Sequence, residues 1–372
     1  MRGAGFLLPL LLLLSACSGG EASAAERPFQ VQEIGQFDEP WAMTFLPNGD
    51  LLVTEKRGRL KFRRADGRVL DVAGVPEVSY GGQGGLGDVV LHPGFAQNRL
   101  VYLSWIEAGD NGTRGAVVGR AHFNFGESGP SLSDLQVIWR QQPKMDGGGH
   151  FSHRIAFGPD GKLYISSGER QHFDPAQDMS GNLGKVVRLN DDGSVPADNP
   201  FAAQGGVAAQ IWTLGHRNLL GLAFDAGGRL WEVEMGPMGG DEVNLIQRGR
   251  NYGWPRASNG SNYDGGDIPD HRPGDGFEPP KVWWNPSISP ASLMIYSGAM
   301  FPQWRGDAFV GALSGEALIR VHLDGENASK ADQWPMNARI REVEQAPDGA
   351  IWLLQDGPSG GRLLRLTPRQ AR

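Results

Sequence analysis

The segment RIAFGPDGKLYISSGE (Arg154–Glu169) contains two short apolar runs joined by a Pro-Asp-Gly turn. Apolar and aromatic runs of this length on either side of such a turn are typical of a tight antiparallel hairpin. A weaker version of the pattern is DAFVGALSGEALIRVHLD (Asp307–Asp324). Four further segments repeat it clearly: WAMTFLPNGDLLVTEKR (Trp41–Arg57), GDVVLHPGFAQNRLVYLSW (Gly87–Trp105), GLAFDAGGRLWEVE (Gly221–Glu234) and REVEQAPDGAIWLLQD (Arg341–Asp356).

The repeats indicate an all-β fold built from similar units. Repeated hairpins of short antiparallel strands at uneven intervals predict a β-propeller with insertions between its blades. The composition agrees, since 55 glycines, 25 prolines and 11 tryptophans among 372 residues suit many short strands and tight turns. A β-sandwich is the alternative, but it gives no reason for one hairpin to recur.

The N-terminus has the pattern of an export signal. The apolar run Phe6–Leu14 is too short to cross a bilayer as a helix, and Leu14-Ser15-Ala16-Cys17 follows it. These small residues before the only cysteine resemble a bacterial lipobox. We therefore expect a lipoprotein signal peptide over residues 1–17, with Cys17 lipidated, a flexible tether over 18–27 and the propeller over 28–372.

The alternative is an ordinary secretory signal that is cut among Ala22–Ala25. Both signals place the folded domain on the periplasmic side of the bacterial envelope, tethered to the membrane in the first case and soluble in the second. The net charge of −7 argues against nucleic acid as a partner. With one cysteine in the whole chain, the mature body has no internal disulfide.

Several polar residues stand just outside the repeated hairpins. In a propeller the loops that flank such strands converge at one end of the central channel, where ligands bind. Taken singly, each residue has a structural explanation as a loop amide, a solvated histidine or a charged strand face. Together they predict a ligand site, and they are Gln83, His150, Glu169, Arg170, Arg217, Asn218, Arg339 and Arg341.

The stretch after the fourth hairpin suggests a calcium site. A glycine-rich bend, Gly236–Gly240, can turn backbone carbonyls outward, and Asp241 and Glu242 supply hard oxygen donors. Arg217 adds a planar cation suited to a carboxylated or carbonyl-bearing ligand. The alternative is a polar loop that joins two strands.

Five motifs carry a specific resemblance: GGQGGLGDVVLHPGF, HFSHRIAFGPDGKLY, GHRNLLGLAF, GPMGGDEVNLIQRGRNYGWP and ARIREVEQAPDG. On these motifs the mature chain resembles the soluble sugar dehydrogenases that depend on pyrroloquinoline quinone (PQQ). The resemblance implies a six-bladed β-propeller of four-stranded antiparallel blades. It also implies PQQ- and calcium-dependent oxidation of aldose sugars at the anomeric carbon to lactones. No haem-attachment CxxCH is present, so electrons would pass to a separate acceptor, a quinone or a cytochrome.

The resemblance also implies roles for single residues. His150 matches the base that takes the proton of the anomeric hydroxyl. Arg217 and Asn218 match residues that bind the quinone oxygens, and Arg217 would stabilise their negative charge during reduction. The remaining cofactor contacts would come from Gln83, Tyr263, Arg339 and Arg341, the two last-named arginines facing the cofactor carboxylates.

The implied metal ligands lie in one motif. Backbone carbonyls of Gly236 and Pro237 match those that bind the Ca²⁺ at the cofactor, where the ion acts as a Lewis acid. Glu242 and the Tyr252 carbonyl match a second, structural Ca²⁺ position.

Two departures from the family pattern matter. Ser314 stands where many members have a lysine that pairs with the cofactor, which weakens the inferred cofactor affinity. Gly149 precedes the base where glucose dehydrogenases have an aspartate, which points towards aldose dehydrogenases of broad specificity.

Other functions stay open at this stage. One is a PQQ-independent, calcium-binding propeller, either a hydrolase or lactonase that uses Asp241 and Glu242 or a sugar-binding lipoprotein. The three arginines favour the quinoprotein over both. A protein-interaction scaffold would need buried aromatic anchors, and Trp283 and Trp284 are candidates. Trp284 could instead form a wall of the substrate cleft or belong to the core.

Overall fold

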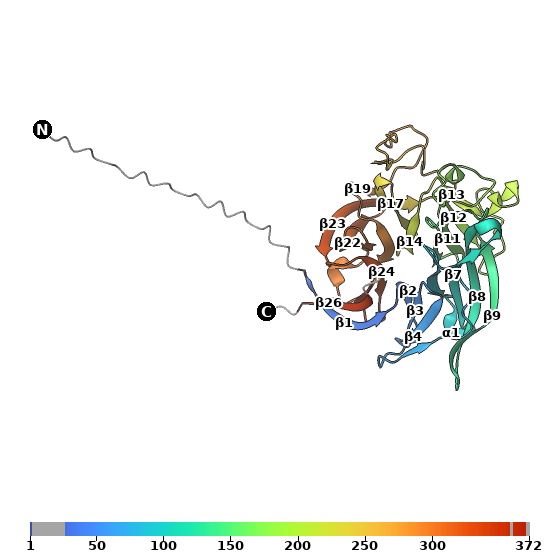
Figure 1. Cartoon of the computed structure of the whole chain (residues 1–372), viewed down its shortest axis with the longest axis vertical. Coiled ribbons are helices and arrows are strands. Elements are labelled where there is room, and N and C mark those ends of the chain that lie inside the picture. The colour runs from blue at the N-terminus through green and yellow to red at the C-terminus, as the bar shows by residue number, and fades with distance from the viewer. Residues whose placement is uncertain (2–26, 358–359, 370–372) are drawn as a thin grey trace.

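The computed structural model describes Met1, residues 27–357 and residues 360–369, and this part of the chain is built almost wholly from β-strands. Six four-stranded antiparallel sheets surround a central channel (Figure 1), as the sequence predicted. The predicted signal peptide, including Cys17, and all of the tether but Arg27 lie outside the described residues.

The sheets are the blades of a propeller, and the first three follow each other in the chain. Blade 1 contains β2 (Pro40–Phe45), β3 (Leu51–Glu55), β4 (Arg59–Arg63) and β5 (Val69–Asp71). Blade 2 contains β6 (Leu86–Leu91), β7 (Leu100–Ala108), β8 (Arg114–Gly126) and β9 (Gly129–Arg140). Blade 3 contains β10 (Ser152–Phe157), β11 (Leu163–Ser167), β12 (Lys185–Leu189) and β13 (Ile211–Leu214).

Blade 4 contains β14 (Leu219–Phe224), β15 (Leu230–Glu234), β17 (Asp241–Ile246) and β19 (Val282–Trp284), with a small extra sheet of β16 (Met238–Gly239) and β18 (Gly260–Ser261). Blade 5 contains β20 (Pro290–Ile295), β21 (Ala308–Ala312), β22 (Ala317–Asp324) and β23 (Asn327–Pro335). Blade 6 contains β24 (Ile340–Gln345), β25 (Ile351–Gln355), β26 (Gly361–Pro368) and β1 (Phe29–Phe37). The short helices are α1 (Phe95–Asn98), η1 (Asp110–Gly112), η2 (Asp174–Ala176), η3 (Ala202–Gln204), η4 (Ala208–Gln210) and η5 (Pro302–Trp304).

Five of the predicted hairpins are the first two strands of five blades. Their turns need a left-handed residue, and Gly49, Gly161 and Gly349 supply it with φ of 85°, 71° and 86°. The prediction for the weaker pattern, Asp307–Asp324, is wrong in one respect. This segment contains β21 and β22, which are the second and third strands of blade 5 and not the first two. The first strand of that blade, β20, is separated from β21 by a longer connection that contains η5, so no tight-turn signal marks it.

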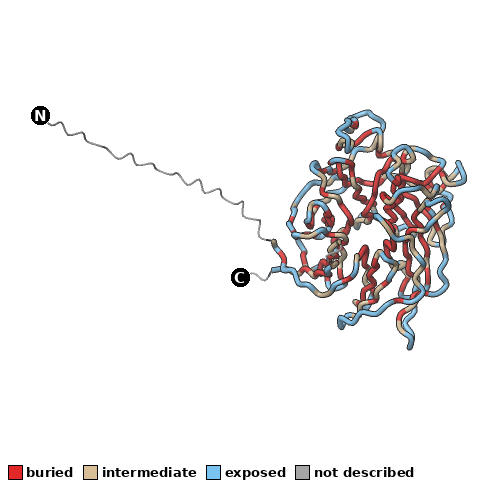
Figure 2. Tube along the Cα trace, viewed as in Figure 1, coloured by how far each residue is buried: buried red, intermediate tan, exposed pale blue. Residues whose placement is uncertain are grey.

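The hydrophobic core consists of one apolar cluster at each of the six junctions between neighbouring blades. Strand β3 shows how this arises, because successive side chains point to opposite faces of a sheet. Leu52 packs against blade 2, whereas Leu51 and Val53 pack against blade 6. Both faces of each blade are therefore buried, and Figure 2 shows the buried residues throughout the interior.

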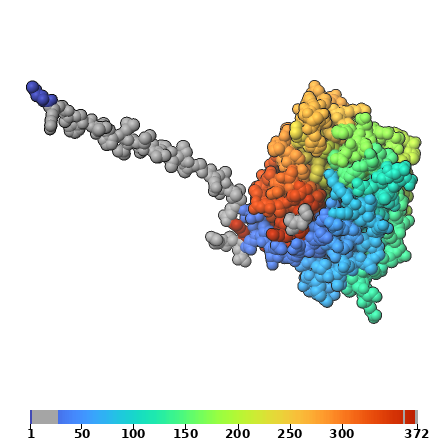
Figure 3. Space-filling model, viewed as in Figure 1, coloured from blue at the N-terminus to red at the C-terminus, as the bar shows by residue number. Residues whose placement is uncertain are grey.

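The ring is closed by the N-terminal strand. β1 pairs antiparallel with β26, from Phe29 opposite Pro368 to Phe37 opposite Gly361. The blue N-terminal part of the folded chain consequently lies against the red C-terminal part (Figure 3). The last blade is completed by the first strand.

Arg154 ties the blades together inside the channel. Its side chain comes from β10 and is buried. Nε donates to the Leu220 carbonyl of blade 4 at 2.7 Å, and Nη2 donates to the Ala291 carbonyl of blade 5 at 2.6 Å. Nη1 lies 3.4 Å from Asp88 of blade 2 and 2.5 Å from Glu342 of blade 6. One guanidinium thus joins four other blades to its own.

Candidate active site

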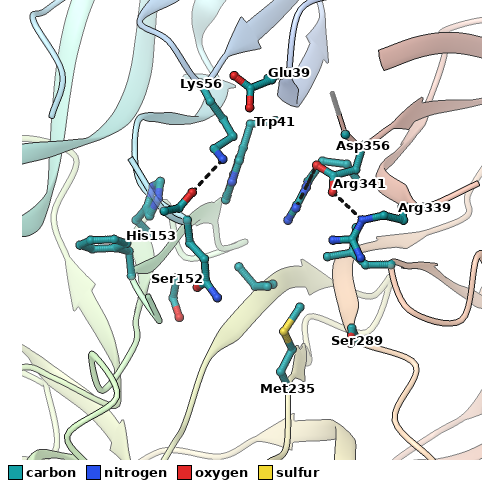
Figure 4. Close-up of a pocket in the computed structure, with 16 residues that line it drawn as sticks. Glu39, Trp41, Lys56, Ser152, His153, Met235, Ser289, Arg339, Arg341 and Asp356 are labelled. Carbon is teal, nitrogen blue, oxygen red and sulfur yellow. Dashed lines mark hydrogen bonds and ion pairs between the residues drawn. The ribbon is translucent and has the colours of Figure 1, made fainter. Parts of the chain in front are cut away.

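A cavity of about 500 Å³ opens at the mouth of the channel, where loops of the six blades meet (Figure 4). A recess of about 510 Å³ adjoins it and shares Gln83, Met235 and Ser289 with it. Most of the residues predicted for the ligand site border these two spaces. Gln83, Arg339 and Arg341 line the cavity, and Gln83, His150, Arg217, Gly236, Pro237, Tyr263 and Ser314 line the recess.

His150 is held rigidly at the edge of the recess. Its ring Nδ1 is hydrogen-bonded to a Glu169 carboxylate oxygen, and its backbone N–H donates to Gln83 Oε1 at 2.7 Å. Its φ of 49° lies in the left-handed region, a strained conformation for a residue with a side chain. Burial lowers the pKa of His150 below its usual value, although Glu169 opposes this shift. A neutral imidazole at neutral pH is suited to accept a proton.

Glu169 is the ionised partner of His150. Burial is the largest single influence and opposes ionisation of the carboxyl. The hydrogen bond and charge of His150, the Phe173 N–H and the charge of Arg217 together outweigh it, and the pKa of Glu169 is lower than usual. The second oxygen, Oε2, accepts from the Phe173 backbone N–H at 2.6 Å. The pair therefore has the arrangement of a base and the group that orients it.

Arg170 fixes the loop that leads to His150. Its guanidinium lies 3.8 Å from the Phe151 ring centroid, and it donates to the carbonyls of Gly147 and Gly149 at 2.9 and 3.0 Å. Burial lowers the pKa of Arg170 to about 10, so the group stays charged at neutral pH. The Gly-Gly-Gly-His loop thus has a fixed backbone.

Arg217 lies beside the Gly236 bend. Nη1 donates to the carbonyls of Met235 and Gly236 at 3.0 and 2.5 Å, and Nη2 lies 3.3 Å from the Tyr263 hydroxyl. Nε is buried and has no hydrogen-bond partner among the described residues. The guanidinium, which lines the recess, therefore retains one N–H donor without a partner in the described part of the chain.

Asn218 is placed differently from the other predicted residues. Its Oδ1 accepts from Ser152 Oγ at 3.1 Å, and its amide nitrogen lies 3.7 Å from the Met235 sulfur. Ser152 and Met235 both line the cavity, so Asn218 is buried behind its wall. In this structure it supports the wall.

Arg339 and Arg341 project from the start of blade 6 and share one counter-ion. Nε of each lies about 3 Å from Asp356, at 2.9 and 3.1 Å respectively. Burial lowers the pKa of Arg341, while Asp356 opposes the shift. Two cations with one carboxylate leave a net positive charge on this wall, which suits an anionic ligand.

Two residues near the recess bear on specificity. Ser314, at the predicted lysine position, donates to or accepts from Ser289 Oγ at 2.8 Å and brings no charge. A Cβ at Gly149 would lie 2.6 Å from Gln171 Oε1, so Gln171 fills the space that an aspartate there would need. Tyr263 is largely exposed, with 71% of its surface accessible.

Asp241 and Glu242 do not form one site, contrary to the simplest interpretation of the sequence. Neighbouring side chains of a strand point to opposite faces. Asp241 accepts from the backbone N–H groups of Gly236, Ile288 and Ser289 at 2.7 to 2.8 Å and thereby shapes the bend. Glu242 faces the other way, into a small cavity with about 10 Å³ of room that Gly240, Tyr252 and Ser258 also line.

A buried acidic cluster lies beside this small cavity, which Glu234 and Glu242 line. The Asn244 amide nitrogen donates to Glu232, Glu234 and Glu242, each at 3.1 Å. Burial raises the pKa of Glu232 and of Glu242 well above the usual value, and neighbouring carboxylates add to the shift. Glu232 Oε1 has no hydrogen-bond partner among the described residues. His216 Nδ1 lies 3.0 Å from Glu234, and the chemistry of this donor set fits a divalent cation.

Trp284 belongs to the core between blades 4 and 5 and does not line the cleft, whereas Trp283 is partly exposed. No sequence pattern points to Met235 or Lys56, which border the cavity, or to Arg154. Glu169 and Arg170 belong to the predicted ligand site, but their contacts with His150 and its loop appear only in three dimensions.

The fold and the site together define a six-bladed propeller with an arginine-rich pocket and a buried histidine–glutamate pair. Residues 37–365 match the Glucose / Sorbosone dehydrogenase family, so the chain belongs to that family. The aldose sugar dehydrogenase YliI of Escherichia coli is 39% identical over 376 residues, which cover 99% of each protein.

Solved structures agree with this assignment. A crystal structure of the soluble aldose sugar dehydrogenase from Escherichia coli in the apo form has a TM-score of 0.87 and 39% identity, over 92% of this chain and 100% of that one. The PQQ-bound form of an aldose sugar dehydrogenase from Streptomyces coelicolor has a TM-score of 0.76 and 30% identity, over 92% of this chain and 98% of that one.

Proposed function

We propose that the protein oxidises aldose sugars at the anomeric carbon to lactones, with PQQ and Ca²⁺ as cofactors. The observation that carries the proposal is the buried His150–Glu169 pair at the edge of a recess that contains Arg217 and adjoins the Arg339–Arg341 wall. Its family, and its relative in Escherichia coli at 39% identity, support the sugar substrate.

The residues present fit PQQ, which carries several carboxylates and an ortho-quinone. The cavity and recess offer room of about 500 Å³ each. Arg339 and Arg341 would hold carboxylates, while the unpartnered Nε of Arg217 would bind a quinone oxygen. The PQQ-bound relative with a TM-score of 0.76 supports this cofactor. A hydrolase that uses Asp241 and Glu242 together has no support, because the two carboxylates face apart.

In the proposed reaction His150 accepts the proton of the anomeric hydroxyl at Nε2, because Nδ1 is bound to Glu169. Glu169 orients the ring and stabilises the imidazolium that forms. Arg217 would stabilise negative charge near the Gly236 bend. When bound, PQQ supplies a two-electron acceptor for the hydride of the anomeric carbon. A separate acceptor, a quinone or a cytochrome, would receive the electrons.

Calcium would have two places. The carbonyls of Gly236 and Pro237 would hold an ion at the cofactor, where it supplies Lewis acidity. Glu242, the Tyr252 carbonyl and the neighbouring carboxylates would hold a structural ion, which would compensate the unpaired oxygen of Glu232.

The test is a titration of calcium-loaded apoprotein with PQQ, followed by tryptophan fluorescence and by dye reduction with a panel of aldoses. We expect saturable binding and sugar-dependent turnover. His150→Ala should retain binding and reduce turnover by at least about 100-fold, the usual contribution of a general base. Turnover that survives this substitution would contradict the assignment of the base, and failure to bind PQQ would contradict the quinoprotein function.

We further propose a periplasmic lipoprotein anchored through Cys17. No helix among the described residues has the length and apolar character needed to cross a membrane. Fractionation of cells that produce the wild type and Cys17→Ala is the test. Release of the variant into the soluble periplasmic fraction is expected, and equally firm membrane association of the variant would refute lipidation.

A further inference from the structure

Lys56 presents a cation to the cavity without an acidic partner. It lies in the turn between β3 and β4 and lines the cavity together with Arg339 and Arg341 (Figure 4). Its Nζ donates to the backbone carbonyl of Gly82 at 3.1 Å, and no ion pair to it is found in the described part of the chain. The Tyr80 ring centroid is 5.8 Å away.

The two carboxylates of the cavity wall already have cationic partners. Asp356 is shared by Arg339 and Arg341. Glu39, the second carboxylate of the cavity wall, has Arg57 at 3.0 Å and accepts from the Tyr80 hydroxyl at 2.7 Å. The cavity therefore has two positive charges in excess, one from Lys56 and one from the arginine pair, which has a single carboxylate for two guanidinium groups.

The backbone holds Lys56 in this position. Its N–H donates to the Glu39 carbonyl at 3.0 Å, and its carbonyl accepts from the Leu86 N–H at 2.9 Å. These bonds join the start of blade 1 to the start of blade 2, so the side chain has a fixed origin at the channel mouth. Burial lowers the pKa of Lys56, with a further contribution from the nearby charge of Arg341, while the charges of Glu39 and Asp356 oppose the shift. An anion bound between the two groups would reverse that effect.

We propose that Lys56 is the third cation of the cofactor pocket and binds a carboxylate of the cofactor in place of the lysine absent at Ser314. This inference rests on the proposed function, because it names the residue that would compensate for Ser314. The two positions lie on different blades, so the fifth-blade position at Ser314 stays without a charge and the first blade supplies the cation.

The experiment measures the dissociation constant of PQQ for calcium-loaded apoprotein by tryptophan quenching, at low and high salt. For Lys56→Gln we expect an increase of about 10-fold or more, since hydrogen bonds to charged groups are the stronger ones. Lys56→Arg should stay close to the wild type, and Ser314→Lys in the Lys56→Gln background should restore part of the affinity. The affinity of Lys56→Gln should also depend less on salt.

Lys162→Gln is the matched control. Lys162 is also half-buried with a single polar partner, Asn190 Oδ1 at 2.6 Å, but it lies in the β10–β11 turn at the far end of blade 3. It should bind PQQ as the wild type does. Equal affinity of wild type and Lys56→Gln would overturn this inference alone. Absence of PQQ binding by the wild type would overturn both this inference and the proposed function.

Discussion

The guanidinium carbon of Arg154 lies 4.0 Å from the ring centroid of Trp41, so blade 1 contacts the one side chain that also bonds to blades 2, 4, 5 and 6. The same indole stacks on its other neighbour, His153, at 4.9 Å with an interplanar angle of 14°. Burial lowers the pKa of His153 to about 3, and the ring is therefore neutral. Trp41 and His153 also line the cavity, so the side chains around Arg154 that join the blades form part of the cavity wall.

Replacing this hub should destabilise the whole ring. Arg154→Met leaves Asp88 and Glu342 buried without their cation, and loss of one partner of a buried pair costs about 3–5 kcal/mol. The free energy of unfolding from urea denaturation measures the effect. Adding Glu342→Gln to Arg154→Met should recover part of the loss, because the two residues interact directly. A single variant as stable as the wild type would contradict the role of Arg154.

Stability should depend on pH through Glu342. Burial raises its pKa to about 7 in the folded state, whereas Arg154 opposes the shift. The folded protein therefore holds this proton more tightly than the unfolded chain, and the associated stability is lost as the pH rises through about 7. Relative to Glu342→Gln, the wild type should be less stable at pH 8 than at pH 5.5. A difference between the two proteins that does not change with pH would refute this.

The charge of Glu169 should set the pH profile of the enzyme. In Glu169→Gln the amide oxygen can still accept a hydrogen bond from His150, but the negative charge that raises the pKa of His150 is lost. The acidic limb of kcat/KM should move to lower pH, because His150 then stays neutral further into the acid range. The maximal rate should fall by about 10-fold or more, since the imidazolium loses its counter-ion. PQQ affinity should be unchanged, and an acidic limb that moves to higher pH would contradict the assignment.

Calcium removal should lower thermal stability. A ligand that binds only the folded state at 100 times its Kd adds about 2.7 kcal/mol, which for a domain of this size corresponds to a decrease in Tm of about 4 °C on chelation. Glu242→Gln should reduce this difference between calcium and chelator, because it removes a proposed ligand. Glu326→Gln, an exposed carboxylate in the turn between β22 and β23, is the control. A chelator without effect on the wild type would exclude the structural ion.

The sequence predicted most of the blades because each first hairpin is a local pattern. Glycine-containing turns, two of them Pro-Asp-Gly, and the apolar runs on either side specify it within about 15 residues of chain. The first hairpin of blade 5 could not be predicted in this way, because β20 and β21 are joined by a longer connection that contains η5. The position of β1 in blade 6 is a contact between the two ends of the chain, which no local pattern encodes.

In the candidate site too, local features could be predicted from the sequence and contacts between distant residues could not. The residue types and their places beside hairpins pointed to His150, Arg217, Arg339 and Arg341, and the structure puts all four on the two adjoining spaces. The separation of Asp241 from Glu242 follows from strand alternation and could have been predicted. The bond between His150 and Glu169 could not, because a separation of 19 residues across a hairpin does not fix a side-chain contact.

The pairing of β1 with β26 also determines the order in which the protein is completed. The ribosome makes β1 first and its partner last, so β1 has to wait unpaired until nearly the whole chain exists. Until then blade 6 has an open edge, and unpaired strand edges are sites of aggregation. A product that ends before β26 cannot close the ring at all. Closure by the first strand therefore makes the folding of blade 6 depend on complete synthesis, since only a chain that includes β26 can pair and cover β1.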